Sequence, residues 1–235
     1  GASNHSVWWF KSSDGVHWRF ASVIANSSRC HELGIATEEG PNEVAVTLLA
    51  DGRSLIAIMR RDGGDGDPHK YHRSYLKSIS TDNGDSWSNP APMARDILSA
   101  RPMIARVPFG ASKHVALVLT GGRPGLNVWV NWKGDGEDWQ TFNLAALHNQ
   151  HVKRGGHTFC DDYVHQKNVS ATFHVSQSSA YNSVVRIGQT ASGDGRALIC
   201  YPLGGSDLQP PGAPTADASC YSNYTRVYCM QMELS

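Results

Sequence analysis

Short runs of branched and aromatic residues alternate with polar turn residues along the whole chain, as in SVWWF at 6–10 and SLIAIMR at 54–60. Gly, Asp, Asn or Pro bounds these runs, and no segment repeats its apolar residues with the 3.6-residue period of a helix. Such segments are typical of β-strands. The pattern predicts antiparallel strands over 6–10, 17–24, 43–49, 54–60, 75–80, 101–107, 113–120, 126–132, 139–144, 183–187, 196–201 and 225–234.

One polar turn is repeated in the chain. Its clearest copy is STDNGDSW at 80–87, a looser copy is SSDGVHW at 12–18, and a degenerate copy is NWKGDGEDW at 131–139. In the clearest copy, Asp82 can accept backbone N–H groups of its own turn, and Gly84 can adopt a conformation closed to most residues. The closing tryptophan is expected to open the next strand and to pack on the hairpin core. Repeated hairpins of this kind favour a propeller over a sandwich or a barrel.

Composition narrows the class of protein. Acidic and basic residues number 21 each, so the formal net charge is zero, and the sequence lacks the basic footprint of a nucleic-acid-binding protein. No apolar run approaches the roughly 20 residues that span a bilayer. The chain opens on GASNHSV, with neither Met nor a signal peptide, so we expect a processed or truncated start.

Cysteines and glycosylation sequons predict the cellular compartment. None of the five cysteines forms a C-x-x-C pair, which argues against a zinc or thioredoxin-like site. Four N-x-[ST] sequons and the cysteines together predict a secreted or lumenal protein with one or two disulfides, although the odd cysteine count weakens this interpretation. Cys220 and Cys229 are the cysteines nearest in sequence. The sequons begin at Asn4, Asn26, Asn168 and Asn223.

The turn at 80–87 matches the Asp-box pattern S-x-D-x-G-x-[ST]-W, and the whole chain resembles the C-terminal part of a sialidase (neuraminidase). The resemblance implies an all-β, six-bladed β-propeller of four-stranded antiparallel blades, whose outer hairpins the Asp-boxes close. Asp-boxes also occur in unrelated propellers. The strand count predicts one domain over 1–235, with about half a blade in 1–41 and roughly three blades in 42–235. The N-terminal two to three blades are then expected to be missing, and a four-bladed ring is the alternative.

Four residues follow the order of the sialidase site. The resemblance implies that Tyr181 is the nucleophile, that Glu43 is its base, and that Arg60 and Arg123 bind the substrate carboxylate. A planar guanidinium bonds both carboxylate oxygens, and a phenol avoids the repulsion that a carboxylate nucleophile would meet. No metal or cofactor is required. The neighbouring Arg61 is the alternative to Arg60, and a strand-end ion pair or an ordinary strand tyrosine is the plain structural interpretation of these residues.

Two parts of the family site have no match upstream of Glu43: the first arginine of the triad and the aspartic acid that acts as general acid. Asp14 belongs to the turn at 12–18. The resemblance therefore implies that residues 1–235 are catalytically incomplete, unless a missing N-terminal part or a separate chain completes the propeller.

Other patterns in the sequence give only weak indications of a functional site. The loop RRDGGDGDPHKYHR at 60–73 gathers Asp and His residues at irregular gaps that fit neither a calcium nor a zinc template, so we expect a solvated loop. LHNQH at 147–151 resembles a family segment of unclear role. Trp8, Trp9 or Trp129 can stack on a sugar, but core packing is the simpler interpretation.

The sequence therefore predicts an exo-sialidase-like retaining glycoside hydrolase that releases terminal sialic (nonulosonic) acid from glycans. Two alternatives remain open. One is a catalytically inactive sialidase-like propeller that acts as an extracellular glycan-binding or structural module. The other is a different glycosidase of this fold that uses paired carboxylates, with Tyr181 far from the site.

Overall fold

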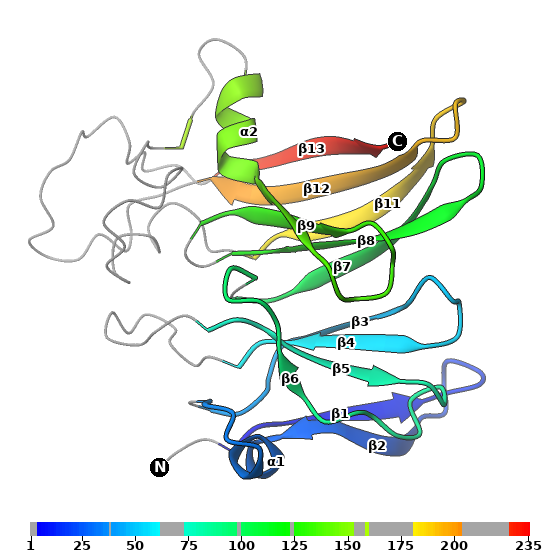
Figure 1. Cartoon of the computed structure of the whole chain (residues 1–235), viewed down its shortest axis with the longest axis vertical. Helices are drawn as coiled ribbons and strands as arrows, with labels where there is room; N and C mark the ends of the chain where they lie inside the picture. Colours follow the sequence, from blue (N-terminus) through cyan, green and yellow to red (C-terminus); the bar gives the residue numbers. More distant parts are fainter. Residues whose placement is uncertain are drawn as a thin grey trace, which may run out of the picture.

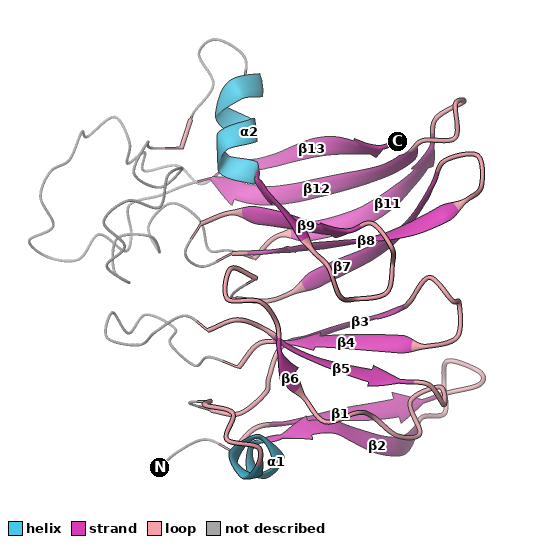
Figure 2. Cartoon of the chain, in the orientation of Figure 1, coloured by secondary structure: helices cyan, strands magenta, loops and turns pink. Residues whose placement is uncertain are grey.

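β-Strands account for nearly all regular structure in this protein (Figure 2). A computed structural model describes residues 4–37, 39–61, 73–97, 100–122, 125–152, 158–159, 181–203 and 226–235. The elements in chain order are β1 Ser6–Lys11, β2 Arg19–Asn26, α1 Ser27–Glu32, β3 Val44–Leu48, β4 Leu55–Met59, β5 Leu76–Ser80, β6 Ala91–Pro92, β7 Met103–Phe109, β8 His114–Gly121, β9 Asn127–Asn131, β10 Gln140–Asn143, α2 Leu144–His151, β11 Ser183–Gln189, β12 Gly195–Leu203 and β13 Arg226–Leu234.

The strands form four antiparallel sheets in sequence order: β1-β2, β3-β4-β5-β6, β7-β8-β9-β10 and β11-β12-β13. Figure 1 shows the sheets stacked one upon the next, from β1-β2 at the bottom to β11-β13 at the top. Each sheet consists of strands consecutive in the chain, which is how blades of a propeller are built. The predicted all-β fold class is confirmed.

The core lies between consecutive sheets, and both faces of the middle sheets are covered. In β4, Ile56 and Ile58 belong to the cluster shared with β7-β10, whereas Ala57 and Met59 belong to the cluster shared with β1-β2. A strand that is buried on both faces has no polar side, so its sequence is a continuous run of apolar residues. This burial explains why the sequence LIAIM shows no alternation.

The two outer sheets differ, because each exposes an apolar face. On β1 and β2, Trp8 is 60% exposed and Phe20 is 53% exposed, with their rings 6.2 Å apart. On β11, Val185 and Ile187 are also exposed. The solvent side of an antiparallel sheet is usually polar, so these faces are suited to packing against further polypeptide.

The repeated turns are held by their own side chains. In the 80–87 turn, Asp82 Oδ1 accepts the Ser86 N–H at 2.9 Å, and Ser80 Oγ accepts the Gly84 N–H at 2.7 Å. Gly84 has φ 81°, as its position in the turn predicted. The indole of Trp87 packs on Trp9 of the preceding sheet at 5.8 Å, but it does not open a strand, because β6 begins at Ala91.

The other two copies repeat these contacts. Asp14 Oδ1 accepts the backbone N–H groups of Val16 and His17, and Asp135 Oδ1 accepts the Glu137 N–H. The bond from Ser86 Oγ holds the pKa of Asp82 well below its usual range, and the His17 ring does the same for Asp14. All three turns therefore carry ionised carboxylates within closed networks.

Three short elements contradict the strand prediction. α1 and α2 begin at asparagine caps, where Asn26 accepts the Arg29 N–H and Asn143 accepts the Ala146 N–H. Helices of so few turns show no sustained period, and Leu144 belongs to α2 rather than to the predicted strand. The two-residue strand β6 is too short to leave a pattern. None of the helices in the described ranges has the length and apolar character needed to cross a membrane.

The disulfide also differs from the nearest-neighbour pairing. Cys229 bonds Cys200, not Cys220, because the β12-β13 register places Cys200 and Cys229 directly opposite each other. Proximity in sequence says little about a pairing across a long connection. Cys30 is buried and free, and burial raises the pKa of its thiol. Cys160 and Cys220 lie outside the described residues.

Candidate functional site

The candidate site lies where the first strands of three sheets begin. β7 contacts both β3 and β11, so these three strands are neighbours across the sheet boundaries. Glu43 directly precedes β3, and Tyr181 lies two residues before β11. Arg60 directly follows β4, which pairs with β3 so that the Arg60 N–H donates to the Glu43 carbonyl at 3.1 Å.

The carboxylate of Glu43 joins two of these residues. Tyr181 Oη donates to Glu43 Oε1 at 2.9 Å, although the two residues are 138 positions apart in the chain. Arg60 Nη1 donates to Glu43 Oε2, also at 2.9 Å. One oxygen therefore faces the phenol, and the other is fixed by a cation. This geometry allows Glu43 to receive the proton of Tyr181.

Exposure differs along this chain of contacts. The Arg60 side chain is only 4% exposed, the Glu43 side chain is 27% exposed, and Tyr181 is 47% exposed. The charge pair is anchored in the interior while the phenol faces solvent. A ligand from solvent therefore reaches Tyr181 first.

Arg61, the alternative to Arg60, faces other groups. Its Nε donates to the Ser74 carbonyl at 2.8 Å, and Nη1 donates to the Ala36 carbonyl at 3.2 Å. These bonds tie together the chain around Ser74 and the segment after α1. Of the two adjacent arginines, it is Arg60 that the structure bonds to Glu43.

Several predicted residues cannot be placed. Arg123, Asn168 and Asn223 lie outside the described residues, as do the Asp and His residues of 62–72. Among the other sequons, Asn4 is exposed, and Asn26 uses its side-chain oxygen to cap α1. Within the described ranges, no group of three or more His, Cys, Asp or Glu residues could hold a metal ion.

LHNQH occupies the second half of α2, and its His148 side chain is buried in the interior. A ring nitrogen of His148 hydrogen-bonds the Tyr201 hydroxyl at 2.8 Å, and its ring lies 4.6 Å from that of Tyr228. Burial raises the pKa of Tyr201 to about 12. This segment positions α2 against β12 and β13, so its contacts are those of packing. Trp129 is likewise fully buried.

A cleft of about 390 Å³ opens beside Tyr181. Arg101, which the sequence analysis did not single out, contributes to its wall from two residues before β7. Glu43 and Tyr181 likewise lie one or two residues before the first strand of their sheets, β3 and β11. A search of the sequence for polar residues just before these first strands could therefore have found Arg101. The remaining wall comes from Met103, Asn182, Ser183, Cys200, Tyr201, Pro202 and Val227.

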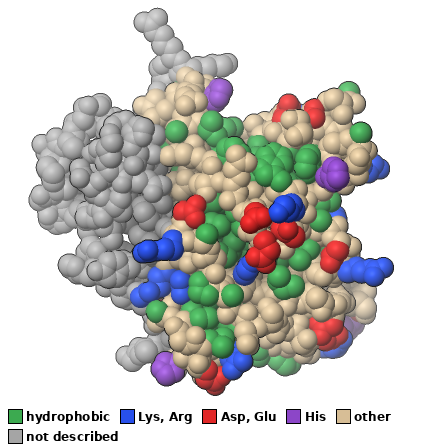
Figure 3. Space-filling model, viewed as in Figure 1, with side chains coloured by type: hydrophobic (Ala, Val, Ile, Leu, Met, Phe, Trp, Pro, Cys, Tyr) green, Lys and Arg blue, Asp and Glu red, His purple; other side chains and the backbone are tan. Residues whose placement is uncertain are grey.

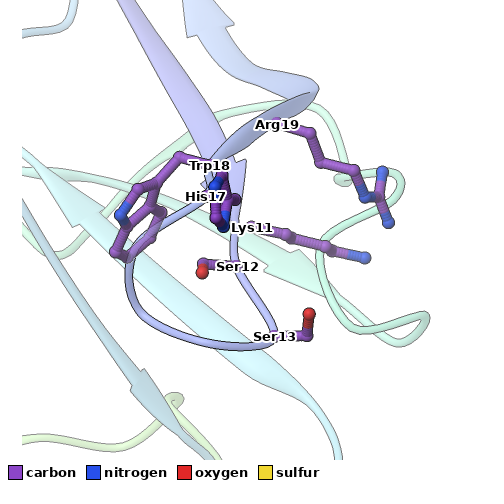
Figure 4. Close-up of a pocket in the computed structure, with 6 residues that line it drawn as sticks. All are labelled: Lys11, Ser12, Ser13, His17, Trp18 and Arg19. Atoms are coloured by element: carbon purple, nitrogen blue, oxygen red, sulfur yellow. The ribbon is translucent and has the colours of Figure 1, made fainter.

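A second hollow, of about 440 Å³, lies at the β1-β2 turn, where Figure 4 shows Lys11 and Arg19 extending to the same side. Two of its polar groups already have carboxylate partners: Lys11 pairs with Asp85 and His17 with Asp14, both at 2.7 Å. The face seen in Figure 3 likewise mixes charges of both signs. The other cleft adjoins the hydrogen-bonded pair of Tyr181 and Glu43 and is therefore the better candidate.

Comparison with known proteins supports the fold. No protein-family model matches the sequence, and no curated protein matches it. Among solved structures, the NanB sialidase of Streptococcus pneumoniae, in complex with 2-[(3-chlorobenzyl)ammonio]ethanesulfonate, aligns with a TM-score of 0.52 and 10% identity. The alignment covers 99% of this chain and 28% of that chain. At this identity, the likeness shows a sialidase-like propeller fold and nothing about activity.

Proposed function

We propose that the protein is an exo-sialidase-like retaining glycoside hydrolase that releases terminal sialic (nonulosonic) acid from glycans. The observation that carries the proposal is the hydrogen bond between Tyr181 and Glu43, made across 138 positions of sequence at the start of neighbouring strands. A phenol paired with a carboxylate base, beside a cleft, is an arrangement suited to nucleophilic catalysis. The fold shared with a sialidase agrees with it.

In the proposed reaction, Glu43 takes the phenolic proton as the Tyr181 oxygen bonds to the anomeric carbon. The bond to the leaving group breaks, and its oxygen receives a proton from an acid that we assign to polypeptide outside these residues. Water then attacks the same carbon, its proton passes to the external acid that is now deprotonated, and the bond to Tyr181 breaks as Glu43 returns its proton to the phenol oxygen. Two displacements retain the configuration of the sugar. Arg60 and Arg123 are assigned to the carboxylate site, which other arginines would share.

The proposed setting is secreted or lumenal. A disulfide between Cys200 and Cys229 is typical of oxidising compartments, and the sequons at Asn4 and Asn26 agree with it. The apolar outer faces of β1-β2 and β11 favour a larger propeller, in which an N-terminal segment or a separate chain supplies the first arginine and the general acid.

A fluorogenic sialoside assay on the full-length protein tests the proposal. Tyr181→Phe removes only the attacking oxygen, so hydrolysis should fall by about a thousandfold or more while folding is kept. Tyr228→Phe is the matched control, because its ring lies in β13 and outside the cleft. Equal hydrolysis by wild type and Tyr181→Phe would remove the nucleophile assignment.

The second candidate is a glycan-binding or structural module without catalysis. The exposed aromatic face around Trp8 and Phe20 favours it, because this face suits assembly with other polypeptide. Binding of sialylated glycans by the full-length protein, with no release of sugar, would support the module and reject the hydrolase.

A further inference from the structure

We propose that Arg101 binds the carboxylate of the substrate in the cleft beside Tyr181 and thereby selects anionic sugars over neutral ones. This role rests on the proposed function, which assigns the reacting sugar to the same cleft. Arg101 differs from Arg60 and Arg123, the two arginines that the resemblance suggested. It lies two residues before β7, which is the first strand of its sheet.

The fold places Arg101 on the same cleft as Tyr181. Glu43, Arg101 and Tyr181 precede β3, β7 and β11, and β7 contacts both of the other strands. Antiparallel sheets stacked in one direction place these three strand starts at the same end. Arg101 and Tyr181 then line one cleft.

Among the described residues, no acidic group compensates the charge of Arg101. Within the described residues, its exposed guanidinium forms no ion pair and no hydrogen bond, whereas Arg60 is already bonded to Glu43 and nearly buried. A guanidinium in a partly enclosed cleft attracts anions more strongly than one on an open surface, because less water screens it. A carboxylate that enters beside Tyr181 therefore finds the cation of Arg101, unpaired among the residues that the structure describes, in the same cleft.

Asn182 also lines the cleft, and its side-chain oxygen has no hydrogen-bond partner among the described residues. Asn182 is buried, and its Nδ2 donates to the Gly121 carbonyl at 3.3 Å, but its Oδ1 accepts no hydrogen bond within the described part of the chain. Buried polar atoms are rarely left unsatisfied without reason. This oxygen is itself buried, so Asn182 contributes to the wall of the cleft, and the polar group that the cleft offers to a ligand is the cation of Arg101.

The apolar part of the wall fits the rest of a sugar. Met103, Pro202 and Val227 present carbon surface that can pack against ring C–H groups. In a nonulosonic acid the carboxylate is attached to the anomeric carbon, which is the atom that Tyr181 would attack. The carboxylate therefore lies within a few bonds of the phenol oxygen, on the scale of one cleft.

Two ligands that differ only in charge test the assignment: the methyl glycoside of N-acetylneuraminic acid and its carboxamide. Isothermal titration measures their dissociation constants for wild type, Arg101→Gln and Arg101→Lys. Loss of a charge-assisted bond should weaken binding of the acid by about 10- to 100-fold and leave the amide within about threefold. Arg101→Lys should recover part of the lost affinity for the acid, because lysine keeps the positive charge but lacks the planar pair of N–H donors of a guanidinium.

Arg53→Gln is the matched control. Arg53 is an exposed arginine in the turn between β3 and β4, at the other end of the sheet, so its removal changes net charge equally without touching the cleft. This variant should retain the wild-type preference for the acid. Thermal unfolding of all variants separates loss of binding from loss of fold.

The outcomes distinguish this inference from the proposed function. If wild type hydrolyses a fluorogenic sialoside but Arg101→Gln keeps the acid-to-amide ratio, the Arg101 assignment is wrong and the hydrolase stands. If the ratio collapses in Arg101→Gln while no sialoside is cleaved, Arg101 is supported and the hydrolase fails. If wild type binds the acid no better than the amide, the assignment of Arg101 is overturned.

Discussion

The two ends of the sheets are built by opposite means. At one end, which we call the turn end, the turns 12–18, 80–87 and 131–139 bond side chains to groups two to five positions away. At the other, the site end, Glu43 bonds residues 17 and 138 positions away. Local bonds hold the carboxylates of Asp14, Asp82 and Asp135 in the three turns. The site end instead leaves the guanidinium of Arg101 without an ion pair among the described residues.

This difference separates stability from chemistry. A closed local network forms as soon as its turn forms and offers little to a ligand, because its polar atoms already have partners. A group held by long-range contacts depends on the whole stack, and it can be left poised for a substrate. Changes at the turn end should therefore alter stability, and changes at the site end should alter turnover.

The largest expected effect is that of Glu43→Gln. The amide keeps the size of the side chain but cannot accept the phenolic proton, so hydrolysis of a sialoside should fall by about 10²- to 10⁴-fold. Stability should fall by about 2–3 kcal/mol, because the nearly buried Arg60 loses its ionic partner and keeps only a neutral acceptor. Steady-state kinetics and urea unfolding measure the two quantities.

Glu137→Gln is the turn-end counterpart of that change. Glu137 pairs with Lys77 on the surface, so its loss should cost less than about 0.5 kcal/mol and leave hydrolysis unchanged. A slow Glu137→Gln enzyme, or a fully active Glu43→Gln enzyme, would contradict the division between the two ends.

The next largest effect is that of Gly84→Ala. The residue has φ 81°, and a methyl group there would overlap the indole of Trp9, so unfolding free energy should fall by about 3 kcal/mol. Gly15→Ala offers a matched comparison, because Gly15 has φ 76° but open space around it, and the expected loss is about 1 kcal/mol. Urea denaturation gives both values. Equal losses would mean that packing on Trp9 contributes nothing.

Asn131→Ala should cost about 2 kcal/mol. The buried amide donates to Asp135 Oδ1 and to the Asp138 carbonyl, and its oxygen accepts the Gly136 N–H, each at 2.9 Å. Removing it leaves buried groups unpaired. Thermal unfolding should show the loss, while the affinity of the folded protein for sialosides should stay at the wild-type value. A weaker affinity would link the turn end to the site.

The smallest expected effect is the loss, at low pH, of the stability that the Asp82 carboxylate contributes. Because the pKa of Asp82 is lowered in the folded protein, its contribution to stability is present above about pH 4 and is lost as the pH falls through the lowered value. The stability difference between wild type and Asp82→Asn should therefore shrink from pH 6 toward pH 2. Urea titrations across this range measure it, and a constant difference would show that the charge of Asp82 is unimportant.

The strands were predictable because their pattern is local. Continuous runs such as LIAIM and the glycine positions of the turns follow from burial and from backbone conformation within a few residues. α1, α2 and β6 were missed because elements of so few residues leave no period. The Cys200–Cys229 pairing was missed because a cross-strand register is not visible in sequence distance.

The sequence by itself determined the all-β class, the repeated turns and, through resemblance to a family, the choice of Glu43, Arg60 and Tyr181 as candidates. Only the tertiary structure decided that Tyr181 and Arg60 share the carboxylate of Glu43, that Arg61 bonds elsewhere, and that Arg101 faces the same cleft. Turn chemistry depends on neighbours along the chain, which the sequence lists in order. A site depends on strand starts that meet only when separate sheets stack, and that arrangement is a property of the packed core.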